Sequence, residues 1–164
     1  MRLSKKTSSA ARRGARPSIV RRVPGIDYAD LENHLGYVLR RAQIAAFVAF
    51  GRASAAADIT PPRYTALVIL RANPGITQTT LGNVLGTARS GAMLLTDWLE
   101  ARGLAERRSR EDDGRAWGLY LTGKGARLLA RLRRRVLAHD ARFGARLMPR
   151  ERAALTRLLD KLAP

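Results

Sequence analysis

Three residues in the second half of the chain have a spacing that could bind a nucleotide phosphate. Gly118, Gly123 and Lys124 match the start of a phosphate-binding loop, in which backbone N–H groups and a lysine hold phosphate oxygens. Gly125 stands where such a loop needs Ser or Thr to hold magnesium. A strand followed by a helix start explains this segment better, so we expect no nucleotide-hydrolysing site.

Other catalytic chemistries lack the residues that they need. The chain has no cysteine, which excludes disulfides, thiol nucleophiles, thiolate zinc sites and thiol-based oxidant sensing. His34 and His139 are far apart in the sequence, no Gly-x-Ser-x-Gly motif is present, and the carboxylates are scattered among arginines. We predict that the protein is not an enzyme and has no metal or cofactor.

Positive charge is the strongest signal in the composition. The 164 residues include 31 Lys and Arg against 13 Asp and Glu, a net charge of +18. Residues 1–22 hold eight basic residues and no acidic one, and the excess continues beyond them. Such an excess favours a polyanionic partner, because phosphate contacts release condensed counterions. A generally arginine-rich composition would give the same charge, so a binding motif is also needed.

Hydropathy favours a soluble protein. The longest apolar run, residues 42–50, contains Gln43 and is shorter than the ~18 residues that span a bilayer. No apolar segment of ~7–15 residues follows the basic N-terminus, so no secretory signal is expected. We predict a cytoplasmic protein that does not associate with membranes.

The pattern of apolar residues predicts a mainly helical chain. Residues 1–25 lack periodicity and are expected to form a flexible basic arm. Residues 27–57 form a helix so apolar over 42–50 that a partner subunit should cover it. Thr60 opens a second helix that stops at Asn73-Pro74-Gly75, Thr77 caps a third that ends at Gly86, and Thr87 opens a fourth that ends at Gly103.

A hairpin and two more helices follow. Residues 104–108 and 116–121 read as strands around an Asp-Gly-containing loop. Thr122 caps a fifth helix, and Pro149 lies in the first turn of a sixth with a stripe of leucines. Two short helices joined by a tight turn and followed by a charged hairpin indicate a winged helix-turn-helix.

In its order of helices and in several sequence motifs, the chain resembles the multiple antibiotic resistance regulator (MarR) family of bacterial transcription factors. The resemblance is carried by ITQTTLGNVLG, ARSGAMLLTDWLEARGL, ERRSREDDGRA and LYLTGKG, between residues 76 and 125. It implies an N-terminal dimerisation helix (26–59), a winged DNA-binding region (60–122) and C-terminal dimerisation helices (123–164), and the basic arm (1–25) lies outside it. Helices of both subunits would intertwine in a two-fold homodimer that binds a pseudo-palindromic site with half-sites ~10 bp apart.

The fourth helix would enter the major groove of double-stranded DNA. With Ala92, Leu95 and Leu99 turned inward, its outward residues are free to contact bases. The hairpin would reach the minor groove, and the start of the third helix would hold phosphates. The predicted DNA contacts are Thr77, Gln78, Thr79, Arg89, Ser90, Met93, Leu94, Arg107, Arg108, Arg110, Asp113 and Arg115.

Some of these roles come from the resemblance and others are open to a second interpretation. The resemblance implies that Arg115 enters the minor groove and that Asp113 braces the hairpin by pairing with an arginine such as Arg107. Met93 and Leu94 could equally be core residues, and the family often has a basic or polar residue where Leu94 stands. Trp98 also departs from the family pattern and is expected to pack against a neighbouring helix.

The resemblance further implies a small effector that binds between the dimerisation helices and the DNA-binding region. Aromatic rings beside guanidinium groups suit an aromatic carboxylate or its coenzyme A thioester, although packing would explain the same rings. The predicted effector residues are Tyr37, Arg40, Arg41, Phe47 and Tyr64. The resulting hypothesis is a repressor that such an effector releases from DNA. The alternatives are an architectural protein that coats DNA with little sequence preference and a module that binds an acidic protein.

Overall fold

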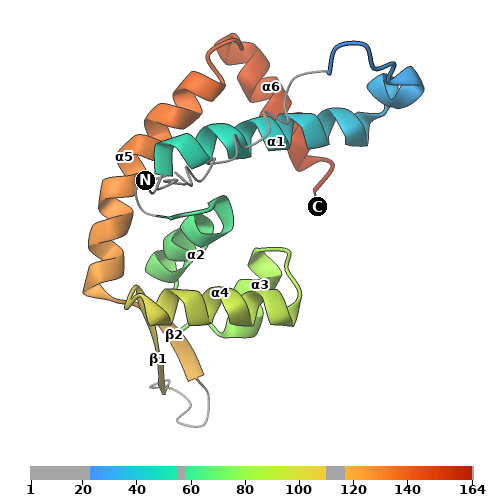
Figure 1. Cartoon of the computed structure of the whole chain (residues 1–164). Helices are drawn as coiled ribbons and strands as arrows, with labels where there is room; N and C mark the ends of the chain where they lie inside the picture. The colour runs from blue at the N-terminus through green and yellow to red at the C-terminus, as the bar shows by residue number, and fades with distance from the viewer. Residues whose placement is uncertain (1–22, 55–57, 110–116, 164) are drawn as a thin grey trace, which may run out of the picture. The chain divides into compact units, whose positions relative to one another are not determined.

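The computed structural model describes residues 23–54, 58–109 and 117–163 (Figure 1). The elements in order are a 3-10 helix (Ala29–Asn33), α1 (Leu35–Ser54), α2 (Pro61–Ala72), α3 (Gln78–Val84), α4 (Arg89–Ala101), β1 (Ala105–Ser109), β2 (Trp117–Leu121), α5 (Gly123–Phe143) and α6 (Pro149–Asp160). This order confirms the predicted mainly helical fold with a hairpin after the helix-turn-helix. The predicted arm up to residue 22 and the predicted hairpin loop lie outside the described residues.

The chain divides into two compact units, residues 1–45 and 46–164, with the boundary inside α1. In the first unit the Tyr28 and Tyr37 ring centroids are 6.2 Å apart. The expected continuous helix over 27–57 is wrong at its start. Ala29 has a φ of 48°, outside the helical region, and His34 has extended backbone with φ −80° and ψ 116°. A 3-10 helix therefore precedes α1.

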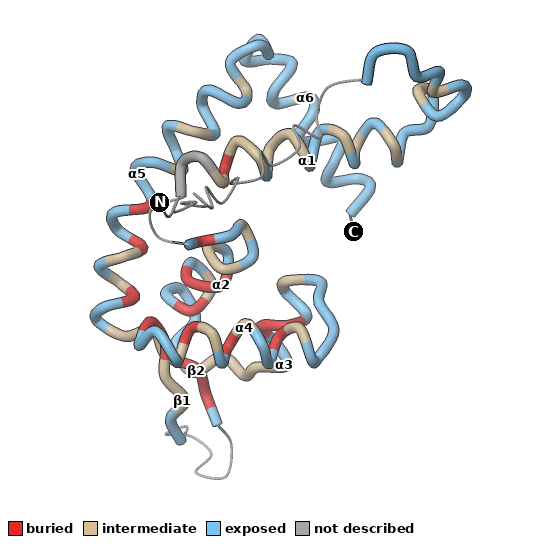
Figure 2. The backbone as a smooth tube through the Cα atoms, in the orientation of Figure 1, coloured by how far each residue is buried: buried red, intermediate tan, exposed pale blue. Residues whose placement is uncertain are grey.

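The core of the second unit lies among α2, α3, α4, the hairpin and the first half of α5 (Figure 2). Leu67, Leu70, Leu81, Leu99 and Leu119 are almost fully buried there. Burial of one such side chain contributes roughly 1.5–3 kcal/mol, so this cluster fixes α4 firmly in the unit.

The starts of α3 and α5 have threonine side-chain caps as predicted, whereas Thr60 occupies the N-cap of α2 without a side-chain hydrogen bond. Thr77 Oγ1 accepts a hydrogen bond from Thr80 N–H (3.1 Å), which caps α3. The cap of α4 differs from the prediction, because Ala88 occupies the N-cap and Thr87 precedes it. Thr87 Oγ1 lies only 2.3 Å from where a Cβ of Gly91 would stand, so the Thr87 side chain lies against the first turn of α4.

The hairpin joins α4 to α5 through a tightly bonded junction. β1 and β2 pair antiparallel with Ala105 opposite Leu121, close to the predicted strands. Thr122 Oγ1 caps α5 by accepting from Gly125 N–H (3.1 Å) and donates to the Gly103 carbonyl (2.6 Å). Thr122 N–H also donates to the Leu104 carbonyl (3.1 Å). The end of α4 and the start of α5 are thus bonded to each other at the base of the hairpin.

The C-terminal part of the chain presents apolar side chains to solvent. None of residues 133–163 is buried. The large apolar side chains exposed there are Leu137, Phe143, Leu147, Met148, Leu155, Leu158, Leu159 and Leu162. Exposed large apolar side chains in such number are typical of an interaction surface. No helix within the described ranges is both long and apolar enough to span a membrane.

Candidate nucleic-acid interface

The first half of α4 presents a row of exposed side chains. Arg89 and Ser90 are exposed, and Met93 and Leu94 are 47% and 68% exposed. On the opposite side Ala92, Thr96 and Leu99 are buried, at 1% exposure or less. Met93 and Leu94 are therefore not core residues, and the second interpretation of them is wrong. Buried Thr96, which periodicity missed, donates its hydroxyl to the Ala92 carbonyl at 2.8 Å and so needs no other partner.

Trp98 anchors the second half of α4 against α2. The Arg63 guanidinium lies 3.8 Å from the centre of the indole, and that of Arg102 lies 4.0 Å from it. Asp58 pairs with both arginines at 3.3 Å, which offsets the repulsion between the two cations. Each stack contributes ~0.5–1 kcal/mol. The expectation that Trp98 packs against a neighbouring helix is confirmed, with α2 supplying Arg63.

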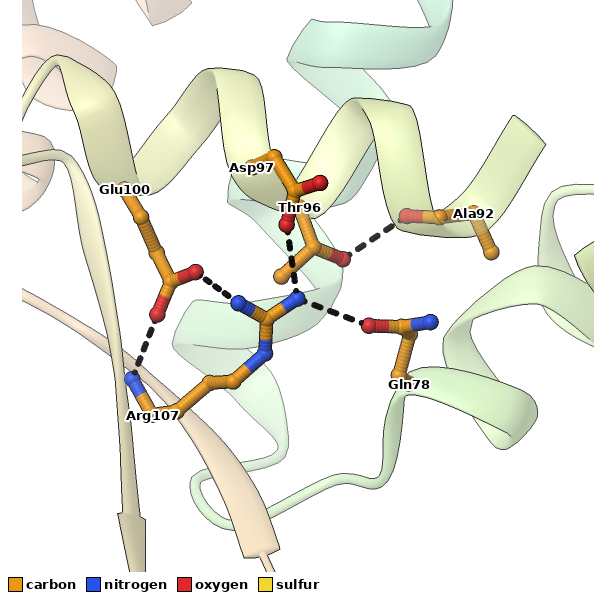
Figure 3. A network of polar contacts seen from close by, with 6 residues as sticks. All are labelled: Gln78, Ala92, Thr96, Asp97, Glu100 and Arg107. Atoms are coloured by element: carbon orange, nitrogen blue, oxygen red, sulfur yellow. Dashed lines mark hydrogen bonds and ion pairs between the residues drawn. The ribbon is translucent and has the colours of Figure 1, made fainter. Parts of the chain in front are cut away.

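Arg107 on β1 joins three elements through one guanidinium (Figure 3). Its backbone N–H donates to Glu100 Oε1 (3.1 Å) and its Nη1 donates to Glu100 Oε2. Its Nη2 donates to Asp97 Oδ1 and to Gln78 Oε1, both at 2.9 Å. Arg107, which the sequence places among the DNA contacts, thus has its guanidinium bound to side chains of α3 and α4. Asp113, its expected partner, lies outside the described residues.

The three predicted phosphate contacts at the start of α3 have different surroundings. Thr77 uses its hydroxyl for the cap, the simpler of the two interpretations. Gln78 is half-buried and has its amide oxygen bound by Arg107. Thr79 is exposed. Of the three, Thr79 has the hydroxyl best placed to meet a ligand from solvent.

Arg108 is the other hairpin arginine that the structure describes. It is exposed, pairs with Glu106, and lies 5.4 Å from the centre of the Tyr120 ring. The remaining predicted hairpin contacts, Arg110, Asp113 and Arg115, fall outside the described residues.

The predicted effector residues divide between the two units of the chain. In the first unit, Arg41 lies 5.8 Å from the Tyr37 ring centre and Arg40 is exposed. In the second unit, Phe47 is 45% exposed and the Tyr64 ring centroid lies 5.7 Å from that of Phe50. The structure therefore brings Tyr37 and Arg41 together and packs Tyr64 against Phe50.

A cavity of about 500 Å³ lies between α2 and α5 in the second unit. Tyr64 and two arginines from opposite walls supply its polar groups, with aliphatic side chains between them. The lining residues are Tyr64, Val68, Arg71, Ala72, Leu129, Ala130 and Arg133. Such a mixture suits an aromatic or aliphatic group that carries a negative charge.

Comparisons with known proteins agree with this geometry. The family model described as MarR family matches residues 57–116. A protein proposed as the transcriptional regulator for the hcr operon of Thauera aromatica is 35% identical over 136 residues, 82% of this chain and 82% of that protein. The chain belongs to the MarR family. It is a MarR-type transcriptional regulator with the winged helix fold of that family.

Solved structures of two MarR-type regulators extend the likeness. The repressor CouR bound to a 23-mer DNA duplex matches with a TM-score of 0.79 and 36% identity over 85% of this chain and 99% of that one. CouR bound to p-coumaroyl-CoA matches with a TM-score of 0.79 and 35% identity over 84% and 97%. PcaV from Streptomyces coelicolor with its natural ligand matches with a TM-score of 0.74 and 32% identity over 84% and 97%.

Sequence reasoning missed two arginines of this MarR-family chain. Arg71 and Arg133 line the cavity from α2 and α5, although they are 62 positions apart. Both lie in basic helical stretches whose charge resembles that of any solvated helix. The only available signal was that each lies about one turn from a core leucine, Leu67 or Leu129.

Proposed function

We propose that this regulator is a homodimeric repressor that binds a pseudo-palindromic operator and is released by a small aromatic acid or its coenzyme A thioester. The observation that carries the proposal is the exposed first half of α4, whose opposite face is locked into the core. A helix fixed in this way can enter the major groove without reorganising.

On this proposal, α4 reads bases and its neighbours hold the backbone. Arg89 has the fork that pairs with guanine, while Met93 and Leu94 have apolar ends that fit thymine methyl groups. Ser90, Thr79 and Arg108 are exposed and suit phosphates or nearby base edges. Roles for Arg110 and Asp113 in the hairpin, and for Arg115 in the minor groove, stay predictions from the family resemblance.

The exposed apolar surface of α5 and α6 supports the homodimer. Eight large apolar side chains between residues 137 and 162 are exposed in a single subunit. Burying them against a second copy would remove them from water, and a two-fold axis would set the two α4 helices on half-sites ~10 bp apart.

The cavity between α2 and α5 supports an anionic effector. Tyr64 can stack on an aromatic ring, while Arg71 and Arg133 can pair with a carboxylate or a phosphate. One relative favours the thioester, since CouR is seen with p-coumaroyl-CoA, and PcaV is likewise seen with a natural ligand. Effector roles for Tyr37, Arg40 and Arg41 in the first unit stay predictions from the family resemblance.

Fluorescence anisotropy would test the repressor proposal. The full chain is titrated with its own upstream intergenic DNA and with a scrambled duplex at about 150 mM salt. Preference of ~10³-fold or more for the upstream DNA supports a sequence-specific regulator. Equal binding to all duplexes, including candidate operators from elsewhere, would instead favour an architectural protein.

Replacing Arg133 with glutamine should weaken the effector response and spare DNA binding. The change removes one of two cavity guanidiniums, and a charged hydrogen bond contributes ~1.5–3 kcal/mol, so release from DNA should need at least ~10-fold more effector. The measurement is effector titration of the preformed complex with a panel of aromatic acids and their thioesters. Arg134→Gln is the matched control, because Arg134 is an exposed neighbour that does not line the cavity. Equal responses of both variants would remove Arg133 from the effector site.

A further inference from the structure

The side-chain amide of Gln78 is held by one end only. Its Oε1 accepts from Arg107 Nη2 at 2.9 Å, while its amide nitrogen donates to no group in the described ranges 23–54, 58–109 and 117–163. Figure 3 shows this nitrogen on the side of the amide away from Arg107. Gln78 therefore has two unused hydrogen-bond donors at the edge of α3.

The identity of the partner decides which end of the amide is unused. A guanidinium only donates hydrogen bonds, so it can hold Gln78 by the oxygen and never by the nitrogen. The amide cannot flip without losing this bond and placing its N–H groups against a cation. Arg107 thus makes Gln78 a donor toward its surroundings, and DNA phosphates are acceptors only.

Arg107 is itself clamped. Glu100 binds it at both the backbone and the guanidinium, and Asp97 shares Nη2 with Gln78. Two carboxylates face this single cation, and the Arg107 side chain is 31% exposed. The two carboxylates offset the positive charge of Arg107, so this arginine is poorly suited to attract a phosphate directly. Because its guanidinium is fixed by three side chains, it is well suited to hold a neighbouring side chain in place.

We propose that Arg107 is a positioning residue that orients the Gln78 amide so that its NH₂ group donates to the DNA backbone. The inference rests on the proposed DNA binding and assigns Arg107 a different task from the direct DNA contact that the sequence suggests. Gln78 is the DNA contact, and the guanidinium of Arg107 on β1 fixes the orientation of its amide.

The decisive variant is Arg107→Lys, which keeps the charge and removes the planar fork. The Kd for one operator duplex is measured by anisotropy across a salt series for wild type, Arg107→Lys, Gln78→Met and the double variant. Gln78→Met should weaken binding about tenfold or more, because each of the two subunits loses one half-exposed hydrogen bond to a phosphate. Arg107→Lys should weaken binding severalfold with an unchanged salt slope, and should add nothing in the Gln78→Met background.

Several outcomes would overturn the proposal. Wild-type affinity of Gln78→Met would remove the contact, and wild-type affinity of Arg107→Lys would show that charge alone suffices. Equal effects of Arg107→Lys with and without Gln78 would mean that Arg107 acts on DNA by another route. A wild-type chain that prefers no duplex would contradict the proposed function itself, a result distinct from all of these.

Two further variants guard against misfolding and indirect effects. Gln78→Glu retains an acceptor for Arg107 but replaces the NH₂ group by a carboxylate oxygen, so it should bind DNA more weakly than Gln78→Met, and thermal unfolding of each variant checks that it is folded. Binding equal to wild type would contradict the donor role. Gln43→Met, the same kind of change at an exposed position of α1, should leave the Kd unchanged.

Discussion

Replacing Gly125 with alanine should lower the free energy of unfolding by ~3 kcal/mol or more, at the upper end of overpacking effects. A Cβ at this position would lie 2.1 Å from the Leu104 carbonyl oxygen and 2.7 Å from Leu121 Cδ1. The carbonyl belongs to the backbone and already accepts from Thr122 N–H, so it cannot move aside without breaking the junction between the hairpin and α5. Thermal unfolding followed by circular dichroism should show a midpoint ~6–12 °C lower.

Gly36 provides the matched control for this prediction. A Cβ there meets no atom within 4 Å, and alanine favours helix. Gly36→Ala should therefore leave the midpoint unchanged or raise it slightly. A Gly125→Ala protein as stable as Gly36→Ala would mean that α5 can start at another angle to the hairpin.

Replacing Arg89 with alanine should cause the largest loss of specific DNA binding. A bidentate arginine–guanine pair contributes ~1–3 kcal/mol, and a dimer would make two, so affinity for the operator should fall at least about thirtyfold. Affinity for a scrambled duplex should fall much less, because that binding depends on phosphates. Anisotropy on both duplexes gives the ratio, and substitution of each operator guanine identifies the base.

Arg89→Lys separates base reading from charge. Lysine retains the positive charge and loses the fork, so it should keep nonspecific affinity while losing most of the specificity. Arg150→Ala, an exposed arginine in the first turn of α6, controls for the change in net charge. Equal losses on operator and scrambled DNA for Arg89→Ala would assign Arg89 to a phosphate.

Features of the fold that depend on neighbours in sequence could be predicted. Thr77 and Thr122 cap their helices as predicted, since a cap needs only residues within one turn. The hairpin strands follow from their turn residues and spacing. The break before α1 was missed, because the unusual φ of Ala29 has no sequence signal, alanine being the strongest helix former.

Features of the site that depend on distant residues could not be predicted. The exposed row on α4 follows from its periodicity, and six of the seven residues that the sequence assigns to one side or the other are exposed or buried as expected. The exception is Leu95, which is only half-buried, while Thr96 next to it is fully buried. The partners of Arg107 come from residues 7, 10 and 29 positions away, and their choice depends on how α3 and α4 cross. The spacing of apolar residues within each helix does not predict the angle at which the two helices cross.

The hydrogen bonds at Thr122 couple α5 to the hairpin and α4, so that a tilt of this helix would rotate both elements of the candidate DNA-binding region. The helix has 21 residues and is therefore ~30 Å long, so a sideways movement of ~1 Å at its far end corresponds to ~2° of rotation at the junction. Thr122 is bonded to Gly103 and Leu104, and Lys124 Nζ donates to the Arg102 carbonyl at 2.7 Å. The hairpin and α4 would turn together with α5, so a shift of ~1 Å at its far end would change the direction of all the candidate DNA contacts of a subunit together.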